Sequence, residues 1–149
     1  TVSDAGAHNF EQLTTGDATV TVTDTESPVT AELAVDRSTA EEGSTDLTYT
    51  VILKDADGNP VTANNAITVT TTLGEVTIAA GASSGTLTVA VQGDDVYVDG
   101  ATVSNAITAI SEANAGDAGS LEQLSFDGTA VTTAIGDSTD TTTLTFADV

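Results

Sequence analysis

The segment GDDVYVDG, residues 93–100, holds three aspartates close to two valines and a tyrosine. Carboxylates at such density can bind a calcium ion, whose oxygen ligands lie roughly 2.3–2.6 Å from the metal. In an extended strand Asp95 and Asp99 would share a face but lie about 13 Å apart, because each residue adds about 3.3 Å. A strand therefore cannot bring both side chains to one ion. The segment can serve as a metal site only if it folds as a loop.

The chain is strongly acidic: 23 Asp and Glu residues against two basic residues, Arg37 and Lys54, give a formal charge of -21. Binding to nucleic acid or to an anionic membrane surface needs a basic face, which this chain cannot build. We therefore expect no nucleic-acid partner and no direct membrane insertion. Because 39% of the residues are hydrophobic and fall in patterned runs, the sequence predicts a folded chain whose acids meet cations rather than a disordered one.

Residues suited to catalysis are scarce. The chain has no cysteine, a single histidine (His8), and no glycine loop with a lysine to hold phosphate. Paired carboxylates are common enough for glycoside hydrolysis to be considered. A sugar-cleaving cleft normally needs aromatic platforms, however, and two Tyr and three Phe leave little to build one. We therefore expect that the chain is not an enzyme.

Apolar and polar residues alternate along much of the chain, as in residues 47–53, and Thr and Val are abundant. Both features favour strands, since β-branched side chains pack well on a pleated surface. Turn sequences such as DGNP at 57–60 separate the runs. The pattern predicts an all-β fold, an immunoglobulin-like Greek-key β-sandwich of about seven strands with an aliphatic core. The expected strands are residues 30–36, 46–54, 66–73, 75–79, 85–92, 102–110 and 129–135.

The chain also repeats itself. Residues 11–13, EQL, recur as residues 122–124, and the shift of 111 residues holds as far as the pair Leu33 and Leu144. A period of this length matches one sandwich domain and predicts a tandem array. We therefore expect residues 1–27 to end a preceding repeat, 28–140 to form one repeat, and 141–149 to begin the next.

The alignment of the two acidic linkers is open by a residue or two. The 111-residue shift pairs Ser27 with Ser138, whereas a shift of 113 residues would pair Asp24 with Asp137. Since the chain opens on Thr1, we also expect it to be a piece of a longer protein. No apolar run long enough to span a membrane and no signal-like N-terminus appears in it.

In a sandwich of this strand order, alternate connections lie at opposite ends. The loop after the first expected strand, the segment 93–100 and the exit of the last strand share one end. Acids crowded there repel one another unless a cation joins them, and oxygen ligands without His or Cys select calcium. A solvated acidic surface is the alternative. We also expect Val96 or Val98 to tuck toward the sandwich. The candidate ligands at this end are Glu42, Asp94, Asp95, Asp99, Asp137 and Asp140.

The opposite end carries further candidates. The segment DADGN at 55–59 begins like an EF-hand loop, but Pro60 replaces its invariant glycine and Ala66 its bidentate glutamate. A hairpin turn that uses Asp57 and Gly58 is therefore favoured over a metal site. The candidate ligands at this end are Asp24, Glu26, Asp55 and Asp57.

Several segments together resemble a known family. TYTVIL (48–53), VTIAAGASSGTLTVAV (76–91), DDVYVDGATVSNAITAI (94–110) and LEQL (121–124) precede an acidic linker, DSTDTTTLT. They are similar to the immunoglobulin-like extender repeats of giant type I-secreted, LapA-like (RTX) bacterial adhesins, which include biofilm and ice-binding adhesins. The resemblance covers nearly the whole chain. It implies calcium in loops and at domain junctions, with Asp94, Asp95, Asp99, Asp137 and Asp140 as suspected ligands.

The expected function is that of a non-catalytic, calcium-stabilised extender repeat of a secreted adhesin on the bacterial cell surface. Neighbouring repeats of the same chain are the expected partners. The alternative is a domain at the adhesin tip that binds sugar or protein. A lesser expectation is head-to-tail self-association, in which the terminal stubs 18–24 and 142–147 of successive molecules pair as strands.

Overall fold

The computed structural model describes residues 16–22 and 25–147. These residues form ten strands and no helix, which confirms the predicted all-β fold. Among the described residues there is no helix long and apolar enough to span a membrane. The strands are β1 (Pro28–Val35), β2 (Thr39–Glu41), β3 (Leu47–Lys54), β4 (Ile67–Thr71), β5 (Gly74–Ile78), β6 (Ser84–Val89), β7 (Ala101–Asn105), β8 (Ile107–Glu112), β9 (Gln123–Phe126) and β10 (Val131–Gly136).

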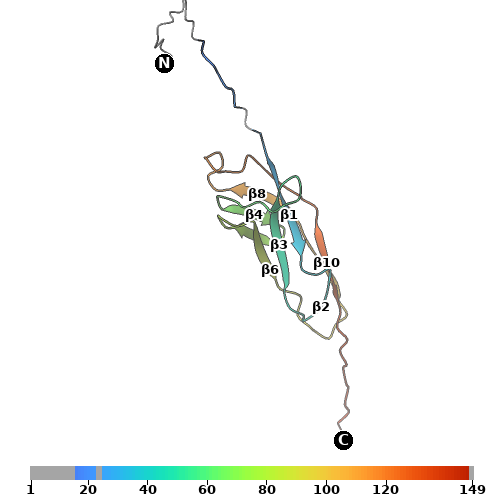
Figure 1. Ribbon diagram of the computed structural model, residues 1–149. Coiled ribbons are helices and arrows are strands. Elements are labelled where there is room, and N and C mark those ends of the chain that lie inside the picture. The colour runs from blue at the N-terminus through green and yellow to red at the C-terminus, as the bar shows by residue number, and fades with distance from the viewer. Residues whose placement is uncertain (1–15, 23–24, 148–149) are drawn as a thin grey trace, which may run out of the picture.

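The strands form three open sheets (Figure 1). The first has the order β6-β3-β1-β9, the second β2-β10-β7 and the third β5-β4-β8. Neighbouring strands are antiparallel, except that β1 pairs with β9 and β2 pairs with β10 in parallel. Buried side chains of the first and third sheets meet in one apolar core, an arrangement consistent with a β-sandwich.

Alternation with a period of two residues builds this core. Four side chains of β3 point inward and are fully buried, and the residues between them are partly exposed. The strands β4 and β5 contribute in the same way. With the exception of Tyr49, the fully buried apolar side chains in these strands are aliphatic, as the low aromatic content predicts: Leu47, Val51, Leu53, Ile67, Val69, Val76 and Ile78.

All seven expected strands have counterparts, but the strand count differs from the prediction. The strands β2 and β9 are not predicted, because runs of three and four residues are too short to show a clear alternation. The strand expected at 102–110 is divided at Ala106 into β7 and β8. The described residues therefore form ten strands rather than about seven.

The break at Ala106 lets one stretch of chain serve two sheets, because β7 pairs with β10 and β8 pairs with β4. The buried side chain of Asn105 marks the crossing. Its Oδ1 accepts hydrogen bonds from the Leu73 N–H (3.2 Å) and from the Thr72 hydroxyl (2.9 Å). These bonds tie the β4–β5 turn to the crossing point.

The chain enters and leaves the sandwich at opposite ends (Figure 1). We call the end that receives the segment before β1 the entry pole, and the end from which residues 137–147 leave the exit pole. The exit pole carries the β2–β3 loop and the β6–β7 loop, joined by a hydrogen bond from Gly43 N to Gln92 O (2.9 Å). The entry pole carries the β3–β4 and β8–β9 loops. Each pole thus gathers loops that are distant in the sequence.

Candidate metal centre

Backbone pairing at the exit pole brings three acidic segments together. The parallel pairing of β2 with β10 ends with Glu41 opposite Gly136, and the next amide, Glu42 N, donates to Gly136 O (3.1 Å). This contact places Glu42 beside Asp137, the first residue after β10. The β6–β7 loop contains the segment 93–100. It is held against the β2–β3 loop by the hydrogen bond from Gly43 N to Gln92 O. As predicted, that segment is a loop and not a strand.

Two glycines allow the β6–β7 loop to approach this closely. Gly43 has φ +66, and a Cβ atom added to it would lie 3.0 Å from the Asp94 Cβ. At the other end of the loop, a Cβ on Gly100 would lie 3.1 Å from the Ile135 carbonyl oxygen. Larger residues would push the loop away from both contacts. The glycines therefore help to set the distance between the acids that the two loops carry.

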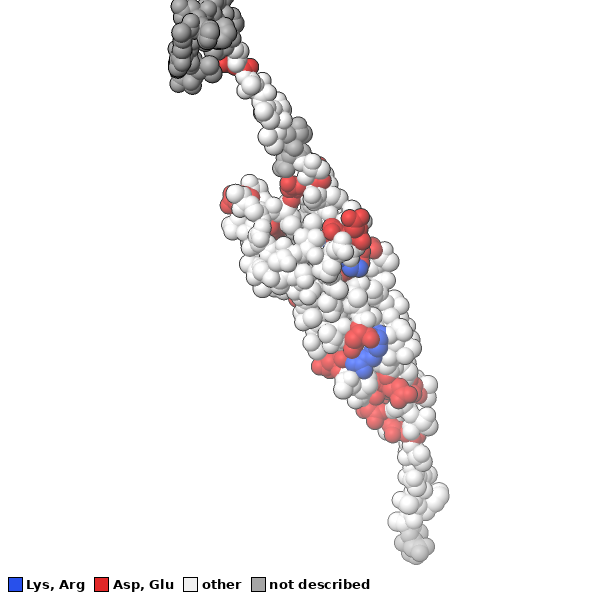
Figure 2. Space-filling model, viewed as in Figure 1, with Lys and Arg blue, Asp and Glu red and all other residues white. Residues whose placement is uncertain are grey.

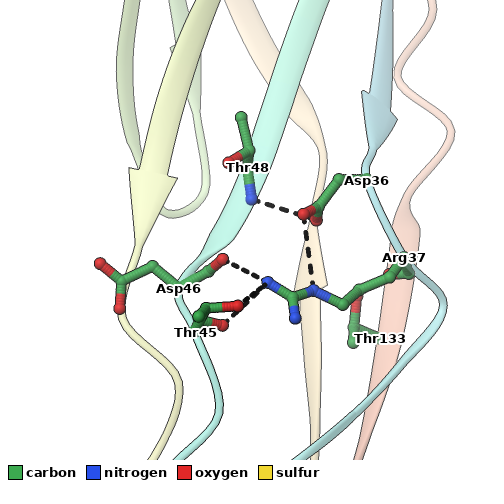
Figure 3. A network of polar contacts seen from close by, with 6 residues as sticks. All are labelled: Asp36, Arg37, Thr45, Asp46, Thr48 and Thr133. Atoms are coloured by element: carbon green, nitrogen blue, oxygen red, sulfur yellow. Dashed lines mark hydrogen bonds and ion pairs between the residues drawn. The ribbon is translucent and has the colours of Figure 1, made fainter.

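Arg37 fastens the β2–β3 loop to the body of the sandwich (Figure 3). Its Nη2 donates to the carbonyl oxygens of Thr45 (2.8 Å) and Asp46 (2.5 Å), and its Nε lies 3.5 Å from Asp36 Oδ2. The Thr133 hydroxyl of β10 donates to the Arg37 carbonyl oxygen (2.8 Å). Arg37, one of the two basic residues, thus positions the β2–β3 loop through its carbonyl oxygens and does not pair with the loop's carboxylates.

Three carboxylates converge at the exit pole: one oxygen each from Glu42, Asp99 and Asp137 lies within 4.8 Å of the other two. Oxygens on opposite sides of a calcium ion are separated by twice the Ca–O distance, about 4.6–5.2 Å. A single calcium ion can therefore contact all three carboxylates without a large movement of the chain. Glu42 is only 5% exposed, Asp137 is partly buried and Asp99 is exposed, so the group opens to solvent on one side.

Three buried carboxylate oxygens at this site have no hydrogen-bond donor among the described residues. Both oxygens of Glu42 and Oδ1 of Asp137 are buried without a hydrogen-bond partner in the described part of the chain. The two basic side chains are bound elsewhere, Arg37 to the β2–β3 loop and Lys54 to Glu32 (2.5 Å). Buried anionic oxygens without partners are costly. A bound divalent cation would remove that cost, which makes the three residues a fitting calcium site.

The proximity of these acids raises the pKa of Glu42 from 4.5 to about 7. The largest cause is that the protonated form can share a hydrogen bond with Asp99, and burial and the charges of Asp99, Asp137 and Asp95 act in the same direction. The metal-free site therefore keeps a proton on Glu42 to a higher pH than an ordinary glutamate does. A calcium ion would have to displace this proton, since the metal binds the carboxylate.

The other candidates at this pole lie around the three-carboxylate group. Asp94 accepts a hydrogen bond from the Ser138 hydroxyl, which fastens the β6–β7 loop to the chain that leaves β10. Asp95 Oδ1 accepts from Tyr97 N (2.7 Å) and forms a local turn. Asp140 lines a pocket of about 190 Å³ between the loop and residues 137–140. As metal ligands these three aspartates remain predictions.

The expectation that Val96 or Val98 tucks toward the sandwich is wrong. Val96 is 63% exposed and Val98 91% exposed, and Tyr97 between them is 72% exposed. The end of the sandwich beneath the loop is occupied by Glu42 and Gly43 instead. The apolar residues of the loop therefore face outward, at the pole from which the chain continues.

At the entry pole, Asp55 is an acceptor within a turn. Its Oδ1 accepts the N–H groups of Asp57 (2.9 Å) and Asn59 (2.8 Å), and these bonds, led by the one from Asn59, lower the pKa of Asp55. Gly58, with φ +84, donates to the Asp55 carbonyl oxygen (3.1 Å). This is the hairpin turn favoured by the sequence. The Asp57 side chain is exposed, and a metal role for either aspartate remains a prediction.

Other acids of the entry pole also have donors. Glu26 accepts from Gln123 Nε2 (2.7 Å) and Glu122 from the Ser27 N–H (2.7 Å). Glu112 accepts from the Leu121 N–H (3.0 Å). Asp24, also a candidate ligand, lies outside the described residues. The hydrogen bonds of Glu26 and Glu122 hold the end of the β8–β9 loop against the incoming chain, and a role for Glu26 in metal binding stays a prediction.

Two residues of the exit pole are missing from the sequence-based candidates. Gln92 contributes its carbonyl oxygen to the contact with Gly43, and its Nε2 donates to Asp99 Oδ2 (2.8 Å). Gly43 directly follows the acidic pair 41–42, and a glycine in that position is a signal of a tight loop that sequence reasoning could have used. Together the two residues orient Asp99 and Glu42.

A family model described as the LapA domain matches residues 28–139, about three quarters of the chain. The chain belongs to the LapA domain family. Membership indicates a role in a LapA-like adhesin and a place at the cell surface. The match includes Glu42, Asp99 and Asp137, so the three-carboxylate group lies within the LapA domain. A search among curated proteins finds no match to the chain.

Proposed function

We propose that this LapA domain is a non-catalytic, calcium-stabilised extender repeat of a secreted bacterial adhesin. The observation that carries the proposal is the group formed by Glu42, Asp99 and Asp137, with buried carboxylate oxygens that lack donors. The group lies at the end of β10, where the chain leaves the sandwich. An ion bound there would fix the direction of the outgoing chain, because Asp137 would be one of its ligands.

The position of exposed apolar residues supports a tandem arrangement. Val20, Val22, Leu144 and Phe146 are 79–91% exposed and lie in extended segments outside the sandwich. In each segment the two apolar residues are separated by one polar residue, as in strands that face a core. Under the 111-residue shift they correspond to Val131 and Thr133 in β10, and to Leu33 and Val35 in β1. In an array these segments would be the last strand of one repeat and the first strand of another.

The strand pairings also fit the immunoglobulin-like topology proposed for the domain. In this assignment β1, β3 and β6 are the A, B and E strands of one sheet. The C strand is β4, the F strand is the divided pair β7 and β8, and the G strand is β10. The parallel pairing of β2 with β10 is that of an A′ strand beside G. The three open sheets would then form the two layers of one sandwich.

The proposed mechanism is mechanical. Without a cation, the acids at each junction repel one another, and the net charge of -21 opposes compaction. Calcium at the exit pole joins segments that otherwise repel and stiffens the connection to the next repeat. In a calcium-poor cytoplasm the chain would be looser, which suits export through a narrow channel. In calcium-rich surroundings the array would become a rod that projects the adhesive tip.

Thermal melting tests this function directly. We expect a higher Tm in millimolar calcium than in excess EGTA, and only a small increase in equal magnesium, because magnesium dehydrates reluctantly and prefers smaller octahedral sites. Coincident melts in all three buffers would contradict calcium stabilisation. A large and equal rise in both metals would point to charge screening rather than to a specific oxygen site.

A binding domain at the adhesin tip is the second candidate, and one observation favours it. The exposed side chains of Val96, Tyr97 and Val98 form an apolar patch of the kind that ligand sites use. Glycan or protein binding that is lost on Tyr97→Ser substitution would support the tip function over the extender function.

Head-to-tail self-association through the terminal stubs also remains a proposal. Residues 16–22 and 141–147 form no strand with the rest of the chain, so they are available for pairing. However, β1 pairs with β3 and β9 and β10 pairs with β2 and β7, so direct pairing of the β1-like and β10-like stubs has no counterpart in this sandwich. Sedimentation of the chain at increasing concentration would measure it.

A further inference from the structure

The β6–β7 loop ends in an outward-facing apolar tip, Val96-Tyr97-Val98, whose side chains are 63%, 72% and 91% exposed. The tip does not occur on a flat side of the sandwich. It lies at the exit pole, where its residues line a pocket together with residues 137–140 of the outgoing chain. Three consecutive exposed apolar residues beside a buried acidic group need a partner, because contiguous exposed apolar surface usually marks an interaction site.

The spacing of the repeat leaves little room between consecutive sandwiches. β10 ends at Gly136, and the 111-residue shift makes Thr139 the counterpart of Pro28, the first residue of β1. The connection is then Asp137-Ser138, and three peptide steps span at most about 11 Å. With the 113-residue shift the connection has four residues and spans at most about 18 Å. In either register the exit pole of one repeat lies against the entry pole of the next.

The entry pole offers a matching groove. A pocket of about 370 Å³ lies there, lined by Ser27, Pro28 and Val29 together with Val61, Leu121 and neighbouring residues. Under the 111-residue shift, Ser27, Pro28 and Val29 correspond to Ser138, Thr139 and Asp140, which line the exit-pole pocket beside the apolar tip. In an array the same three positions would therefore belong to both pockets. The two pockets become the two halves of one junction.

We propose that the tip Val96-Tyr97-Val98 of one repeat docks in the entry-pole groove of the following LapA repeat, against its counterparts of Val61 and Leu121. This proposal rests on the tandem arrangement of the proposed function, and it assigns the partner of the exposed tip. A tyrosine suits such a position, since its ring is buried against apolar side chains while its hydroxyl stays at the wet rim.

Charge explains why an apolar contact is needed at this junction. The exit-pole pocket carries Asp137 and Asp140, and the entry-pole pocket carries Asp55 and Glu122, so both faces are acidic. Two such faces repel at close approach. Burial of the apolar tip would supply attraction that does not depend on charge, while calcium at the neighbouring carboxylates would reduce the repulsion.

A two-repeat chain tests the docking with the whole protein retained. In it, residues 28–138 occur twice in succession between the natural ends, so that one junction is added. Tyr49 is replaced by Phe in both copies; its hydroxyl is buried and has no hydrogen-bond partner among the described residues, so the change should be tolerated. Tyr97→Phe in the second copy leaves Tyr97 of the first copy as the only tyrosine, because the chain has two.

The measurement is the quenching of tyrosine fluorescence by acrylamide, a neutral quencher. We expect the quenching constant of Tyr97 in the first copy to be at least threefold lower than in the single-repeat Tyr49→Phe chain. The matched control keeps the tyrosine in the second copy, which has no following repeat, and should be quenched as strongly as the single chain. A first-copy Tyr97 that is quenched like the control overturns the proposal.

Repetition in calcium and in EGTA separates this proposal from the calcium function. Protection of Tyr97 without any calcium effect on melting would leave the docking standing and refute the calcium role. A calcium-dependent melt with an exposed Tyr97 at the junction would do the reverse. A tip left exposed there would be free for an external ligand, as the tip-domain alternative requires.

Discussion

The two poles of the sandwich treat their acids in opposite ways. At the entry pole Asp55, Glu112 and Glu122 accept hydrogen bonds from backbone amides, and the pKa of Asp55 is lowered. At the exit pole Glu42 is buried with no donor among the described residues, and its pKa is raised to about 7. The same residue types thus accept backbone hydrogen bonds at the entry pole and, in Glu42, form a buried carboxylate without such a donor at the exit pole.

Composition alone does not reveal this difference. Figure 2 shows acidic side chains gathered toward both ends of the molecule, with the two basic patches, from Arg37 and Lys54, each beside an acid. What distinguishes the group of Glu42, Asp99 and Asp137 from the entry-pole acids is that no backbone N–H of the described residues donates to its carboxylates. Where backbone donors are present the charge is already stabilised, and where they are absent we propose that a cation stabilises it. The following predictions test this contrast, beginning with the largest effect.

Removal of two carboxylates from the exit pole should abolish the response to calcium. A site held at a hundred times its Kd adds about 2.7 kcal/mol to the folded state, roughly 5–10 °C in Tm for a chain of this size. The Asp99→Asn/Asp137→Asn double variant should lose that increase in calcium. In EGTA it should melt above the unmodified chain, because repulsion of Glu42 is relieved.

The matched control for this variant is Glu75→Gln/Asp117→Asn, outside the three-carboxylate group, which removes the same charge from two exposed side chains. It should keep the full calcium response. An equal loss of response in both double variants would mean that net charge, and not the exit-pole group, determines calcium binding.

Alanine substitution of one glycine at each pole tests how much the close approach of the exit-pole loops matters. Gly43 and Gly58 both have positive φ, so an alanine at either position costs about 1–2 kcal/mol. A Cβ at Gly58 meets open space, whereas one at Gly43 would lie 3.0 Å from the Asp94 Cβ. Gly43→Ala should therefore melt lower than Gly58→Ala and bind calcium more weakly, and Gly58→Ala should bind it normally. Equal calcium affinities in the two variants would show that the approach of the loops does not matter.

Removal of an entry-pole acceptor should lower stability and leave calcium binding unchanged. Asp55→Ala leaves two turn N–H groups, those of Asp57 and Asn59, without their acceptor. We expect a fall in Tm of a few degrees that is the same in calcium and in EGTA. A smaller calcium response in this variant would instead make Asp55 a ligand, as the sequence allowed.

The smallest expected effect is a pH dependence in the absence of metal. Because the pKa of Glu42 is raised from 4.5 to about 7, its contribution to stability is complete below 4.5 and is lost as the pH rises through 7. The pKa values of Asp55 and Asp127 are lowered from 3.8, so these two groups change the stability only below about pH 3.8. In EGTA, the Tm difference between the unmodified chain and Glu42→Gln should therefore become less favourable to the unmodified chain from pH 5 to pH 8. A constant difference would contradict the raised pKa.

The strands were largely predictable from the sequence because a period of two residues is a local property. Leu47, Tyr49, Val51 and Leu53 alternate in the sequence and are buried in the same alternation. The strands β2 and β9 depend on pairing with β10 and β1, which are distant in the chain, and their own three and four residues carry no pattern. Tertiary pairing decides them.

The candidate site was predictable in part for the same reason. The order of strands suffices to place the loops of Glu42, Asp99 and Asp137 at one pole. Which acids converge there depends on the contacts of Glu42 with β10 and of Gly43 with Gln92, and no local pattern encodes these. The outward orientation of the segment 96–98 was not predicted because apolar residues were expected to point inward, whereas at the proposed junction between repeats they would point outward.

Calorimetric titration of calcium at pH 8 into the unmodified chain and into Glu42→Gln tests the central claim most directly. The substitution keeps the size of the side chain and removes one charge from the three-carboxylate group. We predict saturable binding to the unmodified chain and binding at least tenfold weaker, or none, to the variant. Equal affinity and equal heat in the two chains would contradict the claim that Glu42, Asp99 and Asp137 hold the ion.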